Sequence, residues 1–387
     1  MKICFLCDEY PPARAGGIGS FVRDLGHELV RRGHKVTVVG VYPGIAGKQN
    51  EWDDGIRVVR LPASPSGGRR AFIRDRLRLH SELSRLVRRG VDVIEAPETG
   101  GWGIAAPSST SLVTRMHSPA RYMAREVLGR RRGRLLELVE DLAIRRARAV
   151  AAVSRWVAAR ARRDYPLARF GGRNIEVIYN GVDTSLFRTR PWSERVPGRI
   201  VFAGTLKSQK GIVALLRAIP IVLRRVETAE LVLAGHDTMV DGRPYSEIAT
   251  RQAEIGGLVG KRVRFLGPVS RERLPELYGS ASVCVFPSVA ESFGLVAAEA
   301  MAVGRPVVYS RATAGPELIE DGVTGLLADP SSPEEIANAV IRILTREEEA
   351  RTMARRAAEE VRRRFSVERC AEATLSFYQR VLAGQNH

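Results

Sequence analysis

Short apolar runs alternate with segments of helical periodicity from the start of the chain. An apolar run at 2–7 is followed by a glycine cluster at 16–19. A segment at 21–32 then has apolar residues every three or four positions, and a second apolar run follows at 35–39. This order predicts a buried strand, a glycine-rich loop, a helix and the next strand.

The same order returns in the second half of the chain. An apolar run at 199–203 precedes a loop at 204–211, a helical pattern at 212–226 and another apolar run at 230–234. Two βαβ units that begin alike predict α/β domains with parallel sheets, because parallel neighbours need a crossover connection. Further strand-like runs lie at 91–94, 111–114, 149–153, 175–178, 263–266, 283–286 and 306–309.

The domain boundaries follow from length and composition. A chain of 387 residues fits two domains. The segment 188–198, with two prolines and mixed charge, is the best linker between a first domain at 1–187 and a second at 199–366. A last helical pattern in 367–387 could cross back to the first domain. In parallel sheets, ligands bind at the carboxyl ends of strands, so the loops there are where we expect a site.

The most informative motif is a strand, a loop and a helix around two glutamates. After the run at 283–286, Ser292 is a good candidate for the helix N-cap, and the apolar segment 293–303 predicts the helix. Glu291 then lies just ahead of a helix N-terminus, and Glu299 lies about two turns into the helix.

Such a helix start offers N–H groups and partial positive charge to an anion. Two carboxylates beside it are suited to holding the hydroxyls of a sugar and of a ribose. The alternative is a capping Glu291 and a surface Glu299. It fits poorly, because Val296, Ala297, Ala298, Ala300 and Met301 surround Glu299.

With this motif in place, the chain resembles the retaining GT-B glycosyltransferases of family 4, also called the group 1 glycosyltransferases. The resemblance covers nearly the whole chain. It rests on Gly16-Gly17-Ile18-Gly19, His117, Ser154-Arg155, Asn180-Gly-Val-Asp183, Gly204 to Gly211, Glu291 to Glu299 and Gly315-Pro-Glu317.

The resemblance implies a fold and an activity. The fold is GT-B, with two Rossmann-like domains facing a central cleft, the first on the acceptor side and the second binding the nucleotide sugar. The activity is that of a retaining hexosyltransferase, which moves a sugar from a nucleoside-diphosphate sugar to an acceptor hydroxyl. The acceptor is a glycan, a lipid-linked compound or a small molecule, and neither it nor the nucleobase can be named from the sequence.

The resemblance also assigns the donor contacts. Glu291 would hold the ring hydroxyls of the donor sugar, and Glu299 would hold the ribose. Gly294 lacks a side chain, so a ligand could approach the backbone there closely. The backbone N–H groups that would face sugar and phosphate belong to Phe293, Gly294 and Leu295.

The loop 204–211 resembles the diphosphate grip of the family, Gly-Arg-Leu-x-x-x-Lys-Gly, and Lys210 matches its lysine. Thr205 stands where the family has arginine. Either Lys207 supplies the second positive charge or Thr205 only donates a hydrogen bond. Because Lys210 and the helix dipole can balance the leaving diphosphate, we expect neither a metal nor another cofactor beyond the nucleotide sugar as co-substrate.

Several first-domain residues match family positions, but each has a plainer alternative. Gly16 and Gly17 would contact diphosphate or acceptor, although glycines also serve ordinary turns. His117 would lie beside the donor sugar, although a lone histidine at a strand end is often structural. Glu98 would face the acceptor, with an equally good structural alternative. The turn at Asn180-Gly-Val-Asp183 is interpreted as structural.

The positive charge is concentrated in the first half of the chain. Residues 1–190 contain 35 Lys and Arg against 19 Asp and Glu, whereas residues 191–387 contain 26 against 24. The pattern at 69–89 predicts a basic amphipathic helix, which could lie on an anionic membrane surface and receive a lipid-linked acceptor. The alternative is that its apolar face packs on the domain's sheet and its arginines are merely solvated.

The remaining sequence features narrow the function classes. No apolar stretch approaches the length of a spanning helix, so we expect a cytoplasmic protein, at most peripheral at the inner membrane face. No signature of a nucleic-acid-binding module is found, which makes a basic nucleic-acid-binding protein the weaker rival. The nearer rival is another GT-B nucleotide-sugar enzyme, an epimerase or a phosphorylase.

Overall fold

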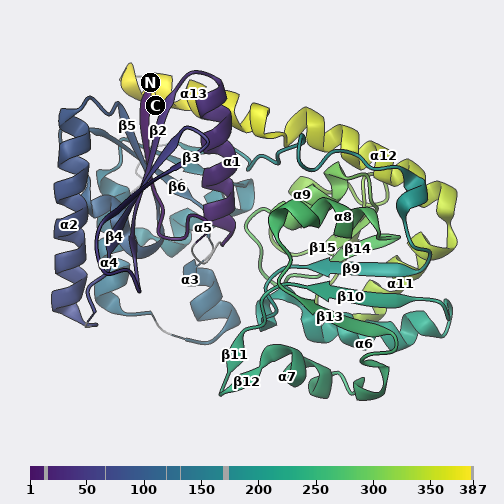
Figure 1. Cartoon of the computed structure of the whole chain (residues 1–387). Coiled ribbons are helices and arrows are strands. Elements are labelled where there is room, and N and C mark those ends of the chain that lie inside the picture. The colour runs from purple at the N-terminus through teal and green to yellow at the C-terminus, as the bar shows by residue number, and fades with distance from the viewer. Residues whose placement is uncertain (13–15, 66, 119, 131, 169–173, 385–387) are drawn as a thin grey trace. The chain divides into compact units, whose positions relative to one another are not determined.

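The computed structural model describes residues 1–387 except 13–15, 66, 119, 131, 169–173 and 385–387. It forms two compact units (Figure 1): unit 1 is Met1–Gly181 with Val367–His387, and unit 2 is Val182–Ser366. The last helix therefore groups with the first domain. The predicted linker 188–198 belongs to unit 2, where the Arg190 N–H donates to the carbonyl of Val303 and the Val196 N–H to that of Ser280.

Unit 1 is built on an eight-stranded sheet, as far as its residues are described, in the order β3-β4-β2-β1-β5-β6-β7-β8. Its neighbouring strands are parallel except β3 and β4. The predicted apolar runs form the strands from β2 to the edge strand β8 in this order. Strands covered on both faces have few polar positions, which is why their sequences are apolar runs. The strands are β1 (Lys2–Leu6), β2 (Lys35–Tyr42), β3 (Gln49–Asp53), β4 (Ile56–Pro62), β5 (Val93–Pro97), β6 (Ser111–Met116), β7 (Ala149–Ala152) and β8 (Ile175–Val177).

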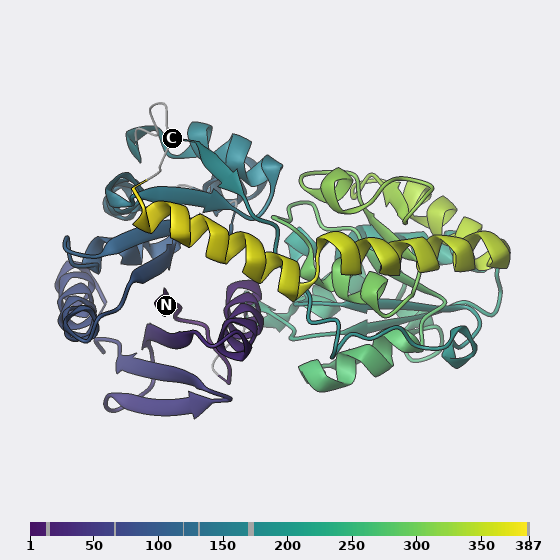
Figure 2. The same ribbon diagram turned by 90° about the horizontal axis from the view of Figure 1, so that it is seen from above.

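Helices cover both faces of this sheet. The connection from β1 to β2 runs toward one edge, whereas those from β4 to β5 and from β6 to β7 run toward the other. Because such crossovers are right-handed, α1 lies on one face, and α2 and α4 lie on the opposite face. Helix α13 packs against α1 (Figure 2). The helices are α1 (Gly17–Arg31), α2 (Arg69–Arg88), the 3-10 segment η1 (Thr99–Ala105), α3 (Ala120–Tyr122), α4 (Arg134–Arg146), α5 (Arg155–Asp164) and α13 (Val367–Leu382).

Unit 2 has a six-stranded parallel sheet within its described residues, in the order β13-β10-β9-β14-β15-β16. Its strands are β9 (Arg199–Ala203), β10 (Glu230–Ala234), β13 (Val263–Gly267), β14 (Val283–Phe286), β15 (Val307–Ser310) and β16 (Leu326–Ala328), beside a small pair β11 (Met239–Val240) and β12 (Arg243–Pro244). Its helices are α6 (Ile212–Leu223), α7 (Tyr245–Gln252), α8 (Leu274–Gly279), α9 (Leu295–Ala302), α10 (Gly315–Leu318), α11 (Pro333–Thr345) and α12 (Glu347–Arg364).

Within the part of the chain that the structure describes, no helix is both long enough and apolar enough to cross a bilayer. The four cysteines are buried and unbridged.

Candidate active site

The strand order of unit 2 reverses at β9. From β9 the chain passes to β10 on one side, and it later returns to β14 on the other side. Ligands of open α/β sheets bind outside the carboxyl ends of the strands at such a switch point. The two loops there, 204–211 after β9 and 287–294 after β14, are the loops that the sequence predicts to hold the donor.

These two loops pack directly on one another. Gly211 has a φ of 68°, and a Cβ atom on it would lie 1.9 Å from the carbonyl oxygen of Pro287. The Val289 N–H donates to the carbonyl of Gln209 at 2.9 Å. Glycine at 211 thus permits a close contact that any side chain would prevent.

The contact brings two predicted site residues together. Lys210 Nζ lies 2.5 Å from Glu291 Oε2, although the residues are 81 positions apart in sequence. Their side chains are 20% and 19% exposed, so the ion pair is accessible to a ligand. An ammonium group and a carboxylate side by side can serve a phosphate and a sugar hydroxyl.

Helix α9 starts later than predicted. It begins at Leu295, and its N-cap is Gly294 rather than Ser292. Gly294 has the left-handed φ of 99°, and a Cβ there would lie 2.0 Å from Tyr309 Oη, which donates to the carbonyl of Phe293. Glycine is required here by the backbone conformation and by Tyr309, independently of any ligand.

The start of α9 still leaves helix N–H groups ahead of the hydrogen-bond ladder. The first helical bonds to Gly294 come from the N–H groups of Ala297 and Ala298. The N–H groups of Leu295 and Val296 therefore precede the ladder, as at any helix start, and carry the positive end of the dipole. The Phe293 ring is buried and packs edge-on against Phe365.

Glu299 lies just over one turn into α9, not about two turns. Its side chain is 6% exposed, and Tyr278 Oη donates to Glu299 Oε2 at 3.3 Å. Burial raises the pKa of Glu299 to about 7, although Arg271 and the Tyr278 hydrogen bond act in the opposite direction. The interpretation as an ordinary surface glutamate is therefore wrong.

Thr205 and Lys207 lie half-buried in the loop after β9. Lys207 is the residue before a short 3-10 segment, η5 (Ser208–Lys210). Their roles toward a diphosphate stay predictions.

In unit 1, Glu98 follows β5 and is completely buried. Its carboxylate accepts the backbone N–H groups of His117 at 2.8 Å and Ser118 at 2.7 Å. Burial raises the pKa of Glu98 to about 7, against the effect of these two hydrogen bonds. The prediction that Glu98 faces an acceptor is not supported, because both oxygens are used inside the domain. Its effect is to position the loop that carries His117.

His117 itself is buried, and its ring packs edge-on against Phe21 of α1 with centroids 4.9 Å apart. Burial, and then the nearby Arg115, hold the pKa of His117 well below its usual range. The imidazole is therefore neutral at physiological pH. A neutral ring can donate or accept a hydrogen bond but carries no charge toward a phosphate.

The glycine cluster at 16–19 differs from the predicted loop. Only Gly16 precedes helix α1, as its N-cap, whereas Gly17 begins the helix. The N–H groups of Ile18 and Gly19 donate to Glu9 Oε1 at 2.8 and 3.0 Å. A carboxylate of the chain thus occupies part of the anion-binding helix start that the sequence predicts for a ligand.

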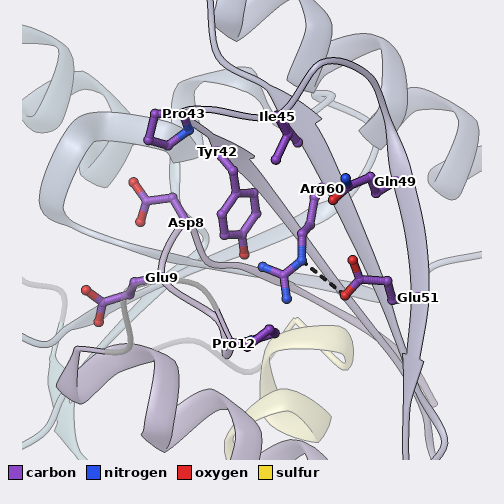
Figure 3. Close-up of a pocket in the computed structure, with 9 residues that line it drawn as sticks. All are labelled: Asp8, Glu9, Pro12, Tyr42, Pro43, Ile45, Gln49, Glu51 and Arg60. Carbon is purple, nitrogen blue, oxygen red and sulfur yellow. Dashed lines mark hydrogen bonds and ion pairs between the residues drawn. The ribbon is translucent and has the colours of Figure 1, made fainter. Parts of the chain in front are cut away.

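A cavity of about 670 Å³ opens beside the ends of β1 and β2 in unit 1 (Figure 3). The Arg60 guanidinium is already engaged there: it lies 4.6 Å from the Tyr42 ring centroid, donates to the carbonyls of Tyr10 and Pro11, and pairs with Glu51. Three carboxylates line the cavity, so its net charge is negative. Its lining residues are Asp8, Glu9, Pro12, Tyr42, Pro43, Ile45, Gln49, Glu51 and Arg60. Sequence reasoning missed this cavity.

Among the described residues, one set of potential metal ligands, His27, Asp53 and Asp54 in unit 1, brings its ligand atoms within 4.8 Å of one another. Asp53 is already engaged, because Arg23 Nε and Tyr10 Oη donate to its Oδ2 at 3.1 and 2.8 Å. This set is not part of the Lys210–Glu291 site.

Comparison with known proteins places both units in one family. Residues 15–186 match the model for glycosyltransferase family 4, and residues 197–346 match the model for glycosyl transferases group 1. An uncharacterized glycosyltransferase of Methanocaldococcus jannaschii is 31% identical over 98% of both chains.

Solved structures agree in fold. Sucrose-phosphate synthase from Thermosynechococcus elongatus aligns with a TM-score of 0.80 at 24% identity, covering 99% of both chains. Anabaena HepE, in complex with UDP and glucose, aligns with a TM-score of 0.74 at 22% identity, covering 98% of this chain and 99% of its own. The chain therefore belongs to the group 1, or family 4, glycosyltransferases and has their GT-B fold.

Proposed function

We propose that this protein is a retaining hexosyltransferase, which moves a sugar from a nucleoside-diphosphate sugar to an acceptor hydroxyl. The observation that carries the proposal is the meeting of Lys210 and Glu291 at the carboxyl ends of β9 and β14. Because HepE binds UDP and glucose, UDP-glucose is the first donor to test.

Lys210 and Glu291 divide the donor between them. Without donor, the ammonium group and the carboxylate satisfy each other. With donor, the sugar hydroxyls donate to Glu291, and Lys210 turns to the diphosphate. There it stabilises the charge that develops as the bond between the anomeric carbon and the phosphate oxygen breaks.

The chemical step needs no protein base in this scheme. The acceptor oxygen bonds to the anomeric carbon on the face that the diphosphate leaves, which retains the configuration. The departing phosphate oxygen takes the acceptor proton. Lys210 and the start of α9 balance the negative charge, so we propose that no metal is required. His117, as a neutral ring, keeps its proposed role as a hydrogen-bonding partner of a sugar hydroxyl.

Glu299 is proposed to hold the ribose, and this gives a pH-dependent prediction. A carboxylate can accept from both ribose hydroxyls, whereas the protonated acid cannot. Because the pKa of Glu299 is about 7, the affinity for UDP is expected to rise between pH 6 and pH 8. Glu299→Ala is expected to weaken UDP binding by about 10- to 100-fold at pH 8, the range for hydrogen bonds to a charged group.

Isothermal titration of UDP across this pH range checks the Glu299 prediction. Glu276→Ala, at an exposed position on α8, is the matched control and is expected to bind as the wild type does. An unchanged UDP affinity in Glu299→Ala would remove the ribose assignment. The pH dependence of the free energy of unfolding is expected to run opposite to that of UDP affinity. Because folding raises the pKa of Glu299, this carboxyl makes the fold less stable as pH rises from about 4.5 to 7.

The cavity of unit 1 is proposed to receive the acceptor. Its three carboxylates repel a phosphorylated group, and the Arg60 guanidinium is already bonded to backbone carbonyls. Carboxylates and the Gln49 amide instead suit the hydroxyls of an uncharged, polyhydroxylated acceptor.

Incubation with radiolabelled UDP-, GDP- and ADP-sugars tests the proposed function. Each donor is paired with neutral and phosphorylated acceptors, and products are separated by chromatography. Labelled product with neutral acceptors supports both proposals, and product with phosphorylated acceptors alone overturns only the acceptor class. A labelled epimer without acceptor would indicate an epimerase. If no donor is either transferred or hydrolysed, the assignment as an enzyme is refuted.

A further inference from the structure

Helix α2 is divided between the core and the surface. Leu79, Leu83 and Leu86 pack into the core beneath the sheet of unit 1, which confirms the alternative of core packing for this part of the helix. The other end differs: Ile73 and Leu77, one turn apart, are 57% and 63% exposed.

Helix α4 exposes a longer apolar stripe. Leu135, Leu138 and Leu142 share one face of the helix by their spacing and are 44%, 42% and 37% exposed. The opposite face buries Glu140 and Ile144. An ordinary surface helix buries its apolar face and exposes its charged face. Helix α4 partly does the opposite, because it exposes three leucines and buries a glutamate.

The charges of both helices are sorted by sign. Each of their acidic residues is buried or half-buried and paired: Ser64 donates to Asp75, Lys48 to Glu82, Arg125 to Glu137, Arg132 to Glu140 and Arg121 to Asp141. The exposed charged residues of both helices are all arginines. They are Arg69, Arg70, Arg74, Arg85 and Arg88 on α2, and Arg134, Arg145 and Arg146 on α4.

The two helices flank the same short segment on one face of the sheet. Arg76 of α2 donates to the carbonyl of Gly100 in η1, and Arg146 of α4 donates to the carbonyls of Ile104 and Ala106 at 2.7 and 3.0 Å. Figure 1 shows both helices on the side of the sheet away from α1. Their exposed leucines, isoleucine and arginines form what we call the α2–α4 surface.

We propose that the α2–α4 surface docks unit 1 on an anionic lipid bilayer. Arginines of one sign are attracted to anionic headgroups, and the five exposed apolar side chains enter the boundary with the acyl chains. Nucleic acid would explain the arginines but not the exposed leucine stripe of α4. An anionic bilayer can contact both the arginines and the exposed apolar side chains. The acidic residues of α2 and α4 do not repel it, because they are buried or half-buried and paired.

Sedimentation with vesicles tests the docking. The full chain is mixed with vesicles of phosphatidylcholine alone, or of phosphatidylcholine and phosphatidylglycerol, at low and high salt. We expect binding to the anionic vesicles that weakens with salt. Each arginine near an anionic membrane surface raises the vesicle partition coefficient about fivefold. Reversing the charge of four arginines, in R70E/R74E/R134E/R145E, is therefore expected to lower this coefficient more than about 100-fold.

Two further variants separate the contributions of the surface. L135S/L138S/L142S is expected to reduce anionic binding by more than about tenfold, because burying a leucine in an apolar phase is strongly favourable. R243E/R251E/R355E/R356E makes the same charge change at exposed positions of unit 2 and is expected to bind as wild type. Unchanged circular dichroism and thermal unfolding of the variants show that unit 1 is still folded, because the substitutions in the α2–α4 surface lie in unit 1. Unchanged UDP affinity shows in addition that the proposed donor site in unit 2 is intact.

The results that would contradict membrane docking are measured as vesicle binding, so they can be told apart from a failure of the proposed transfer reaction. Wild-type protein that stays in the supernatant with anionic vesicles would overturn the docking. So would equal losses in the unit 2 control. If the leucine variant binds as wild type, the apolar insertion is wrong. Retention of DNA in a gel shift, without vesicle binding, would replace the membrane by a nucleic acid.

Discussion

Glu291→Ala is expected to lower kcat/KM for transfer by about 1000-fold or more while the protein stays folded. The carboxylate would grip sugar hydroxyls, and hydrogen bonds that strengthen in an oxocarbenium-like transition state supply several kcal/mol. Its contribution to the fold is small, because its ion pair with Lys210 is partly exposed and such pairs contribute little to stability. Steady-state kinetics with the identified donor measure the loss.

Two variants sharpen the Glu291 prediction. Glu291→Gln keeps the size and one acceptor oxygen but removes the charge, so an intermediate loss is expected. Glu276→Ala, exposed on α8, should leave the rate unchanged. Turnover of Glu291→Ala at the wild-type rate would show that the donor sugar is held elsewhere.

Lys210→Ala is expected to lower the rate of transfer by about 10²–10³, the usual effect of removing one preorganised group that stabilises developing charge. The loss should fall on kcat more than on KM, because charge on the leaving diphosphate grows in the transition state. Lys261→Ala, at an exposed position in the same unit, is the matched control. A Lys210 variant that changes only KM would argue against a role in leaving-group stabilisation.

Lys207→Ala separates the two explanations for Thr205. A loss comparable to that of Lys210→Ala means that Lys207 replaces the arginine of the family. A wild-type rate means that one cation is enough.

Much of the fold could be predicted from the sequence because its strands are buried on both faces. Continuous apolar runs such as 199–203 and 283–286 coincide with β9 and β14, and the helical pattern at 69–89 coincides with α2. The hairpin of β3 and β4 was not predicted. β3 is polar and mostly exposed, so it has no apolar pattern. The local signals for the hairpin are the turn at Asp54-Gly55, where both residues have positive φ, and the buried apolar residues of β4.

The sequence predicted which residues form the candidate site better than it predicted how these residues are arranged. Helix α9 starts at Leu295 because the backbone at Gly294 is left-handed, and no propensity of Ser292 or Phe293 reveals this. The contact of Lys210 with Glu291 depends on how two distant loops pack. The burial of Glu98 likewise depends on the neighbouring loop at His117. Local sequence patterns carry no information about such non-local contacts.

The central claim, sugar transfer with retention from a nucleotide sugar, is tested most directly by following the reaction with proton NMR. The donor and a neutral acceptor are mixed with wild-type protein, and the anomeric signals are recorded over time. We expect the donor signal to fall as nucleoside diphosphate is released, and one new anomeric signal to grow with the donor's configuration. A product of inverted configuration would contradict the retaining mechanism, and a donor signal that stays constant with every donor and acceptor tested would contradict the assignment as a whole.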